Sequence, residues 1–123
     1  MTIQELYEKI GGNYDQAVRV MRKDKLIDKY VRKFEKNDSC NELIAATETM
    51  DAKGIFDAAH AMKGVCANLG FDDLSNRAGE LTEEFRAGNP RSLSDEEVKE
   101  KVAGIKEVYS HTIDEIRAYA AES

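Results

Sequence analysis

A histidine, a lysine and a glycine stand close together in the segment His60-Ala-Met-Lys63-Gly64. The ordinary pKa of an imidazole lies near cellular pH, so a neutral ring nitrogen can act as a nucleophile without a dedicated base. On a helix, residues three and four positions later lie beside that ring. Lys63 would there offset the charge of a bound phosphoryl group, and Gly64 would leave the ring open to a second protein. The spacing therefore indicates a histidine that accepts a phosphoryl group.

The segment 52–69 is predicted to be a helix that places His60 toward solvent. At about 100° per residue, its apolar side chains fall in one narrow arc that faces the core, namely Ile55, Ala59, Met62, Cys66 and Leu69. His60 lies about 150° from the centre of this arc. A lone histidine is more often a hydrogen-bonded core residue, and the geometry argues against that interpretation here. His111, in contrast, is followed by Asp114 and Glu115 at the same two offsets and is interpreted as an ordinary surface residue.

The composition is that of a single globular domain over residues 1–123. Of the 123 residues, 41% are hydrophobic and 34% are charged, which excludes a disordered chain. The net charge of −6 disfavours nucleic acid as a general partner. No apolar run approaches the ~20 residues that a membrane span needs, and no leader segment is visible, so we expect a cytoplasmic protein with no membrane partner.

Two local features add to this picture. The segment 19–36 holds eight Lys or Arg against three Asp or Glu, a local charge of +5. It is interpreted either as a solvated helix face or as a patch that attracts an acidic partner. Cys40 and Cys66 lack the close spacing of a zinc or redox motif and are expected to be reduced and packed in the core.

Three Ser/Thr-x-x-Glu boxes mark helix starts, because each pair can satisfy unpaired amides of a first helical turn. The pairs are Thr2 with Glu5, Ser39 with Glu42, and Ser94 with Glu97. Apolar spacing predicts a short first helix before residues 11–13 and one longer helical stretch from about Tyr14 to Asn37-Asp38. Further helices are expected over about 40–50, 52–69, 72–87 and 95–121, with Gly70 as a left-handed cap and Gly88-Asn89-Pro90 as a stop.

The fold class is predicted to be all-α, because no segment alternates apolar and polar residues as a strand requires. Long helices joined by short connections pack antiparallel. The expected architecture is therefore an antiparallel up-down four-helix bundle with an additional N-terminal helical segment.

The segment 58–70 resembles histidine-containing phosphotransfer (HPt) domains. It reads Ala-Ala-His-Ala-Met-Lys-Gly-Val-Cys-Ala-Asn-Leu-Gly, and the signature of that family is His-x-x-Lys-Gly followed by small residues and a glycine that ends the helix. The likeness continues through Leu74 and Leu81 into the next helix, and its specific part spans residues 43–87.

The resemblance implies that His60 is the phosphoacceptor, that Lys63 neighbours the phosphoryl group and that Gly64 provides clearance. Family members often carry a polar residue such as glutamine at the position of Thr82, so a hydrogen bond from there to the imidazole would be altered in this chain. Arg86, one turn later, is a candidate phosphate contact. The resemblance implies no cofactor or metal in the chain itself, because the partner receiver domain supplies the Mg²⁺ site.

By the same resemblance, the chain is expected to be a phosphorelay intermediate of two-component signalling. It would accept a phosphoryl group on His60 from a receiver-domain aspartate and pass it to another receiver domain, with response-regulator receivers and a hybrid histidine kinase as partners. It would be a monomeric phosphoryl carrier without catalytic turnover of its own. Docking of a receiver is expected around His60, with apolar contacts from Ile10, Tyr14 and Phe56.

Three other interpretations stay open. The phosphoacceptor domain of a chemotaxis-type histidine kinase uses a similar bundle and histidine, but a chain that starts at Met1 and lacks a kinase region argues for the relay protein. In a non-catalytic helical scaffold, His60 would be incidental. A hydrolase or metalloenzyme is disfavoured, because the two histidines lie on separate helices, with no cysteine ligands nearby, no nucleophile-base pair and no glycine-rich phosphate loop.

Overall fold

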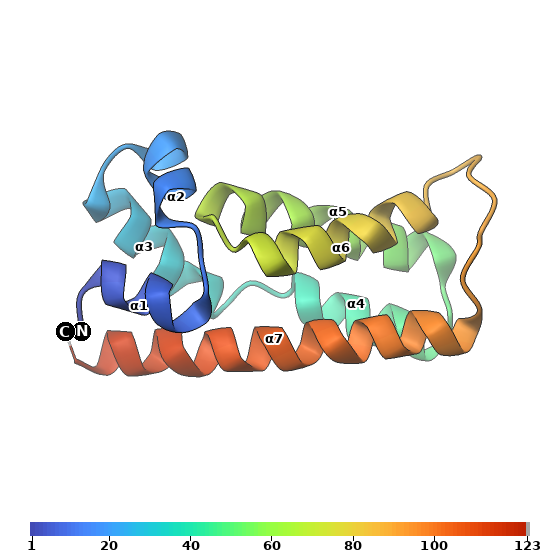
Figure 1. Cartoon of the computed structure of the whole chain (residues 1–123). Coiled ribbons are helices and arrows are strands. Elements are labelled where there is room, and N and C mark those ends of the chain that lie inside the picture. The colour runs from blue at the N-terminus through green and yellow to red at the C-terminus, as the bar shows by residue number, and fades with distance from the viewer. Residues whose placement is uncertain (123) are drawn as a thin grey trace.

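A computed structural model describes residues 1–122, and this part of the chain is helical without a strand. Its helices are α1 (Ile3–Ile10), α2 (Tyr14–Met21), α3 (Asp24–Phe34), α4 (Ser39–Glu48), α5 (Ala52–Leu69), α6 (Asp72–Glu84) and α7 (Asp95–Ala121). Helices α4 to α7 alternate in direction and form a four-helix bundle, and the short helices α1 to α3 gather at one end of it (Figure 1). The predicted all-α bundle with an additional N-terminal helical segment is confirmed.

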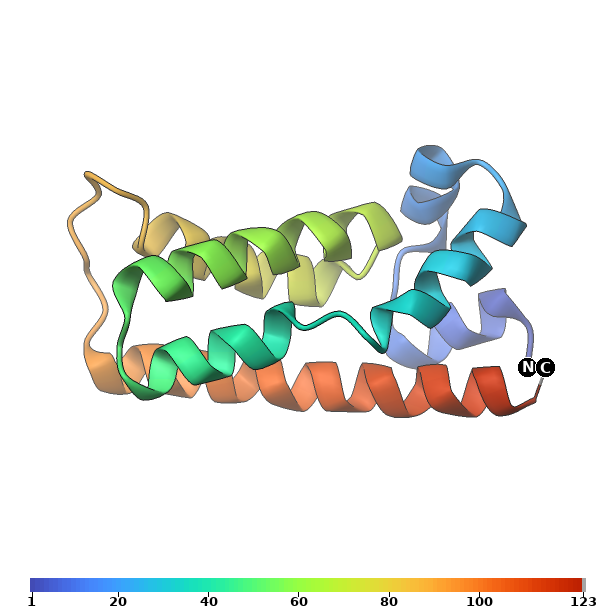
Figure 2. The same ribbon diagram turned by 180° about the vertical axis from the view of Figure 1, so that it is seen from behind.

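The longest helix, α7, runs along the whole molecule and supports both of its ends. Helix α4 packs along one half of α7 and α1 along the other, and α6 also contacts it (Figure 2). Helices α5 and α6 form the most extensive pair on the opposite side. The two ends of the described part of the chain meet beside α1, where the Met1 amino group lies 2.9 Å from a carboxylate oxygen of Glu122.

The stretch predicted as one helix from Tyr14 to Asn37 is two helices, and that prediction is wrong. Arg22 adopts a left-handed backbone conformation with φ 68°, and its amide donates to the Val18 carbonyl at 2.8 Å, which ends α2. Helix α3 then begins at Asp24 and packs against α2. The usual helix-ending residues are glycine and proline, so the apolar spacing gave no sign of a break at an arginine.

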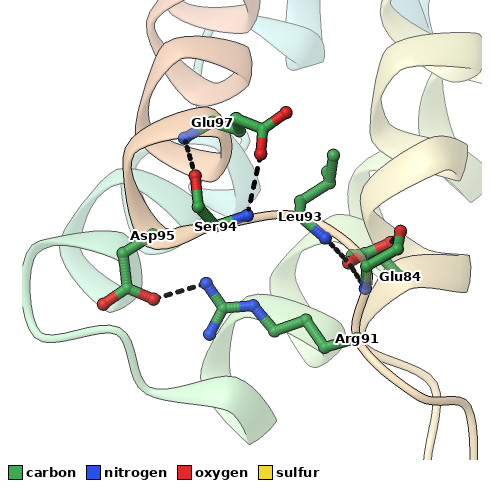
Figure 3. Close-up of polar contacts among 7 residues, drawn as sticks. Glu84, Arg91, Leu93, Ser94, Asp95 and Glu97 are labelled. Atoms are coloured by element: carbon green, nitrogen blue, oxygen red, sulfur yellow. Dashed lines mark hydrogen bonds and ion pairs between the residues drawn. The ribbon is translucent and has the colours of Figure 1, made fainter.

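Two of the three predicted capping boxes form. In the pairs Thr2 with Glu5 and Ser94 with Glu97, each side chain binds the backbone amide of the other residue at 3.1 to 3.2 Å, and Figure 3 shows the second pair. The box predicted at Ser39 does not form. Its amide and hydroxyl both donate to the side-chain oxygen of Asn37, at 3.0 and 2.5 Å, so the hydroxyl is oriented away from the amides of α4.

Helix α6 ends at Glu84, three residues before the predicted end at 87. The Glu84 carboxylate accepts the backbone amides of Ser92 and Leu93, each at 2.6 Å, and Arg91 pairs with Asp95 in the first turn of α7 (Figure 3). These contacts tie the connection between α6 and α7 to both helices.

The C-terminal end of α5 is joined to the N-terminal part of the chain. Gly70 ends the helix in the predicted left-handed conformation, with φ 73°. Its carbonyl accepts the Asn13 amide at 2.7 Å, and the carbonyl of Leu69 accepts the buried Tyr7 hydroxyl at 2.7 Å. These bonds position α1 and the start of α2 against the end of α5.

Every helix contributes buried apolar side chains to one core. The five residues predicted to face inward on α5 are at most 3% exposed. Cys40 and Cys66 are free and buried as predicted, and burial raises the pKa of the Cys40 thiol to about 11 and that of the Cys66 thiol to about 12. Among the helices of residues 1–122, none combines the length and the hydrophobicity of a membrane span.

Candidate functional site

His60 lies in the middle of α5 and is exposed to solvent, as the sequence predicted. Asp51 caps the start of the helix, and its carboxylate accepts the Gly54 amide at 3.3 Å. On the opposite face, Ala59 and Met62 are fully buried. The imidazole is exposed because the apolar arc of the same helix is fixed in the bundle.

The ring of Phe56, one helical turn before His60, lies alongside the imidazole. The two ring centroids are 5.7 Å apart and the planes differ by 7°, which is an offset parallel stack. Phe56 is half-buried, so its position is set by the bundle. It was predicted as a contact for a docked partner, and in the free chain it is an aromatic neighbour of His60.

Lys63 is exposed one turn after His60, and its side chain extends toward α6. A Cβ atom placed on Gly79 would lie 3.6 Å from the Cδ atom of Lys63, which is van der Waals contact. The Ser75 hydroxyl also donates to the Lys63 carbonyl at 3.2 Å. Helix α6 therefore lies beside the Lys63 side chain on the same surface as the imidazole.

Gly64 is exposed, and a Cβ atom added there would have no neighbour within 4 Å. The glycine is therefore not required for close packing of α5 on another helix. Of the two reasons that the sequence allows for a glycine inside this helix, helix packing and access to the histidine, the open space favours access.

Arg86 reaches the site from the residues that follow α6. Its Nη2 and Nε atoms donate to the two carboxylate oxygens of Glu83, at 2.7 and 3.1 Å. Its guanidinium carbon lies 5.7 Å from the centre of the Phe56 ring, within the range of a cation–π contact. Arg86 and His60 therefore contact the same aromatic side chain.

Thr82 differs from the other predicted site residues in being fully buried. Its hydroxyl donates to the Ala78 carbonyl of the same helix at 2.9 Å. Because this bond uses the hydroxyl proton within α6, the side chain has no proton left to donate to an imidazole. The structure therefore does not bring Thr82 into the exposed group formed by His60, Lys63 and Arg86.

Glu83 is a site residue that the sequence analysis missed. Its carboxylate binds Arg86, and this hydrogen bond together with the positive charges of Arg86 and Lys63 lowers its pKa. A glutamate three positions before an arginine is a common surface pair, so only its place beside the predicted Arg86 could have pointed to it.

Two other predicted docking residues lie elsewhere. Ile10 is half-buried beside Phe71 and Val108, in a small hollow between α1, the start of α6 and α7. The ring of Tyr14 packs edge-on against Tyr7 at 5.5 Å, and its hydroxyl binds Asp24. Both side chains are thus engaged with the end of the bundle formed by α1 to α3.

Apolar side chains are exposed instead on α2 and α3, namely Val18, Val20, Leu26 and Tyr30. Val20 and Tyr30 line a largely apolar groove of about 450 Å³ between these helices and the C-terminal half of α5. On α5, the groove is lined by Val65, Asn68 and Leu69, which begin one residue after Gly64. We call this region the α2–α3 groove.

His111 is exposed on α7, and its Nε2 atom lies 3.2 Å from the Lys9 carbonyl oxygen at the end of α1. It has none of the cationic and aromatic neighbours of His60 in the contacts above. Within residues 1–122, no three His, Cys, Asp or Glu side chains come together in a group that could hold a metal ion.

Comparison with known proteins identifies one family. Residues 34–119, more than half of the chain, match the family model of the Hpt domain. No curated protein and no solved structure gave a match. The matched range includes α5 and α6, with His60, Lys63, Gly64, Thr82 and Arg86.

Proposed function

The chain belongs to the Hpt domain family, and from this we propose that it is a phosphorelay intermediate whose phosphoacceptor is His60. Hpt domains take part in histidine phosphotransfer in two-component and phosphorelay signalling, with receiver domains and kinases as partners. They are phosphoryl carriers and not, in general, catalysts with turnover. The observation that carries the assignment to His60 is its exposure on α5 between Phe56, Lys63 and the open position at Gly64.

In the proposed step, a ring nitrogen of His60 attacks the phosphorus of an aspartyl phosphate on a receiver domain. The bond from phosphorus to the aspartate oxygen breaks, a bond from phosphorus to nitrogen forms, and the aspartate leaves as a carboxylate. The Mg²⁺ ion would be held by the receiver, so this chain needs to supply only the nucleophile and positive charge. Lys63 and Arg86 are the cations placed to offset the phosphoryl charge.

The test is transfer from phosphorylated receiver domains to the purified chain. We expect an acid-labile, base-stable label that mass spectrometry assigns to the peptide containing His60. Reversal in the presence of an unphosphorylated receiver would demonstrate a carrier. A complete lack of label with a broad panel of receivers would favour the helical scaffold instead.

Replacing Gly64 by Ala is expected to stabilise the chain while slowing transfer. Because a Cβ atom there meets nothing within 4 Å, the gain in helix propensity should raise the free energy of unfolding. The expected gain is about 0.5–1 kcal/mol, measured by urea denaturation. Gly64→Leu should reduce kcat/KM for transfer about tenfold or more, since its side chain would occupy the approach to the ring.

The matched control is Ala52→Leu, at an exposed position two turns before His60 on the same helix. It should leave transfer unchanged. If Gly64→Leu transfers as fast as Ala52→Leu, the clearance role of Gly64 is wrong.

The α2–α3 groove is the best candidate for the part of the docking surface beyond His60. It is apolar, it begins on α5 one residue after Gly64, and its other wall carries exposed Val20 and Tyr30. Lys33, one of the basic residues of the segment 19–36, lines it, and the positive charge of this segment suits the acidic surface around a phosphorylated aspartate. This groove replaces Ile10 and Tyr14 in the proposal.

Val20→Asp is expected to weaken receiver docking. An aspartate in this apolar surface should raise KM for transfer about five- to tenfold, with a smaller effect on kcat, because His60 itself is untouched. Ala103→Asp introduces the same charge at an exposed position of α7 and should leave KM as in the wild type. Equal KM values for the two variants would place docking elsewhere.

A further inference from the structure

The carboxylate of Glu83 binds Arg86, the cation that lies over the Phe56 ring. Both of its oxygens accept from Arg86, at 2.7 and 3.1 Å. Arg86 lies beyond the end of α6, so the regular hydrogen bonds of that helix do not position it. The Glu83 pair therefore determines where the guanidinium lies, and that place is 5.7 Å from the Phe56 ring that stacks on His60.

The backbone around Arg86 supports the same position. The Arg86 amide donates to the Glu83 carbonyl at 3.3 Å, and the Asn89 side chain donates to that carbonyl at 2.6 Å. Gly88 has a positive φ of 85°, which lets the chain turn back at this point. The turn after α6 thus keeps Arg86 beside α5.

The side chain of Lys63 extends from α5 toward Gly79 of α6, where an added Cβ atom would lie 3.6 Å from its Cδ atom. Gly79 is one helical turn before Glu83. The charge of Lys63 contributes to the lowered pKa of Glu83, after the larger effects of Arg86. Lys63 therefore adds positive charge near the pair that Glu83 forms with Arg86.

A further carboxylate near His60 lies on its own helix. Asp57 is three positions before it and pairs with Lys53 at 3.9 Å. A phosphoryl group on His60 would add a charge of about −1.5 to −2 at this place. Such a group would compete with Glu83 for Arg86.

We propose that Glu83 is a positioning residue that holds Arg86 beside the unphosphorylated imidazole and releases it to the phosphoryl group once His60 carries it. This inference rests on the proposed function, in that it takes His60 as the residue that carries the phosphoryl group. Glu83 would keep the guanidinium of Arg86 ordered at the site, and its own charge would oppose the phosphorylated form. Removal of that charge would then favour phosphohistidine.

The test loads the full chain without any receiver, using phosphoramidate in a His111→Gln background. The phosphoryl group leaves the ammonia nitrogen of the reagent and bonds to a ring nitrogen of His60, and the displaced ammonia takes up the ring proton. The pH dependence of the phosphorus-31 chemical shift then reports the apparent pKa of the bound phosphoryl group. Glu83→Gln should lower this pKa by about 0.3 of a pH unit, and Arg86→Gln should raise it by a similar amount.

The double variant distinguishes positioning from simple repulsion. In the Arg86→Gln background, Glu83→Gln should have a clearly smaller effect, because no guanidinium is left to release. The same effect in both backgrounds would show that Glu83 acts only as a charge and would overturn the proposal. Glu80→Gln, whose carboxylate pairs with Lys101 of α7 at 3.2 Å, is the matched control and should not change the phosphoryl pKa.

Two further results would also overturn it. One is an Arg86→Gln variant with the wild-type phosphoryl pKa, because Arg86 would then not reach the phosphoryl group. The other is a Glu83→Gln variant that matches Glu80→Gln. Failure of transfer from receivers, with the phosphorus-31 results as expected, would count against the proposed function and leave the role of Glu83 intact.

With a receiver that does transfer, Glu83→Gln should shift the transfer equilibrium toward phosphorylated His60 by roughly two- to fivefold at low salt. The shift should shrink as ionic strength rises, because these side chains are exposed and salt screens their interaction. A shift toward the receiver would contradict the proposal.

Discussion

His60→Gln is expected to abolish phosphoryl acceptance, with no label above that of a sample without the chain. Glutamine keeps a polar side chain on the exposed face of α5 but has no ring nitrogen to attack phosphorus. The fold should be retained, because an exposed substitution usually changes the free energy of unfolding by no more than about 0.5 kcal/mol. Radiolabel transfer measures phosphoryl acceptance, and circular dichroism with urea denaturation measures whether the fold is retained.

The chain contains its own control for this experiment. His111 is also exposed and also lies on a helix, but its imidazole faces the Lys9 carbonyl and is without the neighbours of His60. His111→Gln should therefore accept phosphoryl groups as the wild type does. Full transfer to His60→Gln, or loss of transfer in His111→Gln, would move the phosphoacceptor away from α5.

Gly70→Ala is expected to cause the largest loss of stability of any substitution considered for this chain. The residue has a φ of 73°, and a left-handed conformation costs other residues roughly 1–2 kcal/mol. A Cβ atom would in addition collide with the carbonyl oxygen of Asn13 and lie 3.0 Å from its carbonyl carbon. Relief of this clash has to move backbone, so the free energy of unfolding should fall by about 3 kcal/mol or more in urea denaturation.

Gly11→Ala is the matched control. Gly11 also ends a helix with a positive φ, 66°, but a Cβ atom there meets nothing within 4 Å. In Gly11→Ala, the free energy of unfolding should fall only by the cost of the left-handed conformation, about 1 kcal/mol. Similar losses in the two variants would mean that the contact between Asn13 and the end of α5 contributes little to stability.

The outward position of His60 could be predicted because a single helix face decides it. The apolar arc of α5 is regular over 18 residues, and the fully buried positions fall where that arc predicts. The same reasoning failed between Tyr14 and Asn37, where the apolar spacing does not reveal the left-handed turn at Arg22. Periodicity reports which side of a helix is buried, but it reports poorly where a helix ends in a residue other than glycine or proline.

The rest of the candidate site depends on contacts between α5 and α6, which sequence spacing cannot supply. The resemblance named Thr82 and Arg86 together, yet the structure buries Thr82 and brings Arg86 over Phe56. One position on α6 faces the core and the other belongs to the turn after it. Glu83 was missed because its pair with Arg86 resembles a common surface pair, and only the fold places that pair beside Phe56 of the neighbouring helix.

The docking role expected of Ile10 and Tyr14 stays a prediction. The structure adds that both side chains help to join α1 and α2 to the bundle. The exposed apolar side chains of α2 and α3 could be identified only after the break at Arg22 was known. Side chains of three helices form the α2–α3 groove, so the sequence of no single helix reveals it.

Because Met1 and Glu122 meet beside α1, both ends of the described chain lie at the same end of the molecule. A fluorophore, a solid support or a neighbouring protein module attached at either end would project from that end of the molecule, whereas His60 lies midway along α5. The two ends are close enough for a short peptide to close the chain into a ring without stretching a helix. Immobilisation through a terminus should therefore leave the imidazole accessible to proteins in solution.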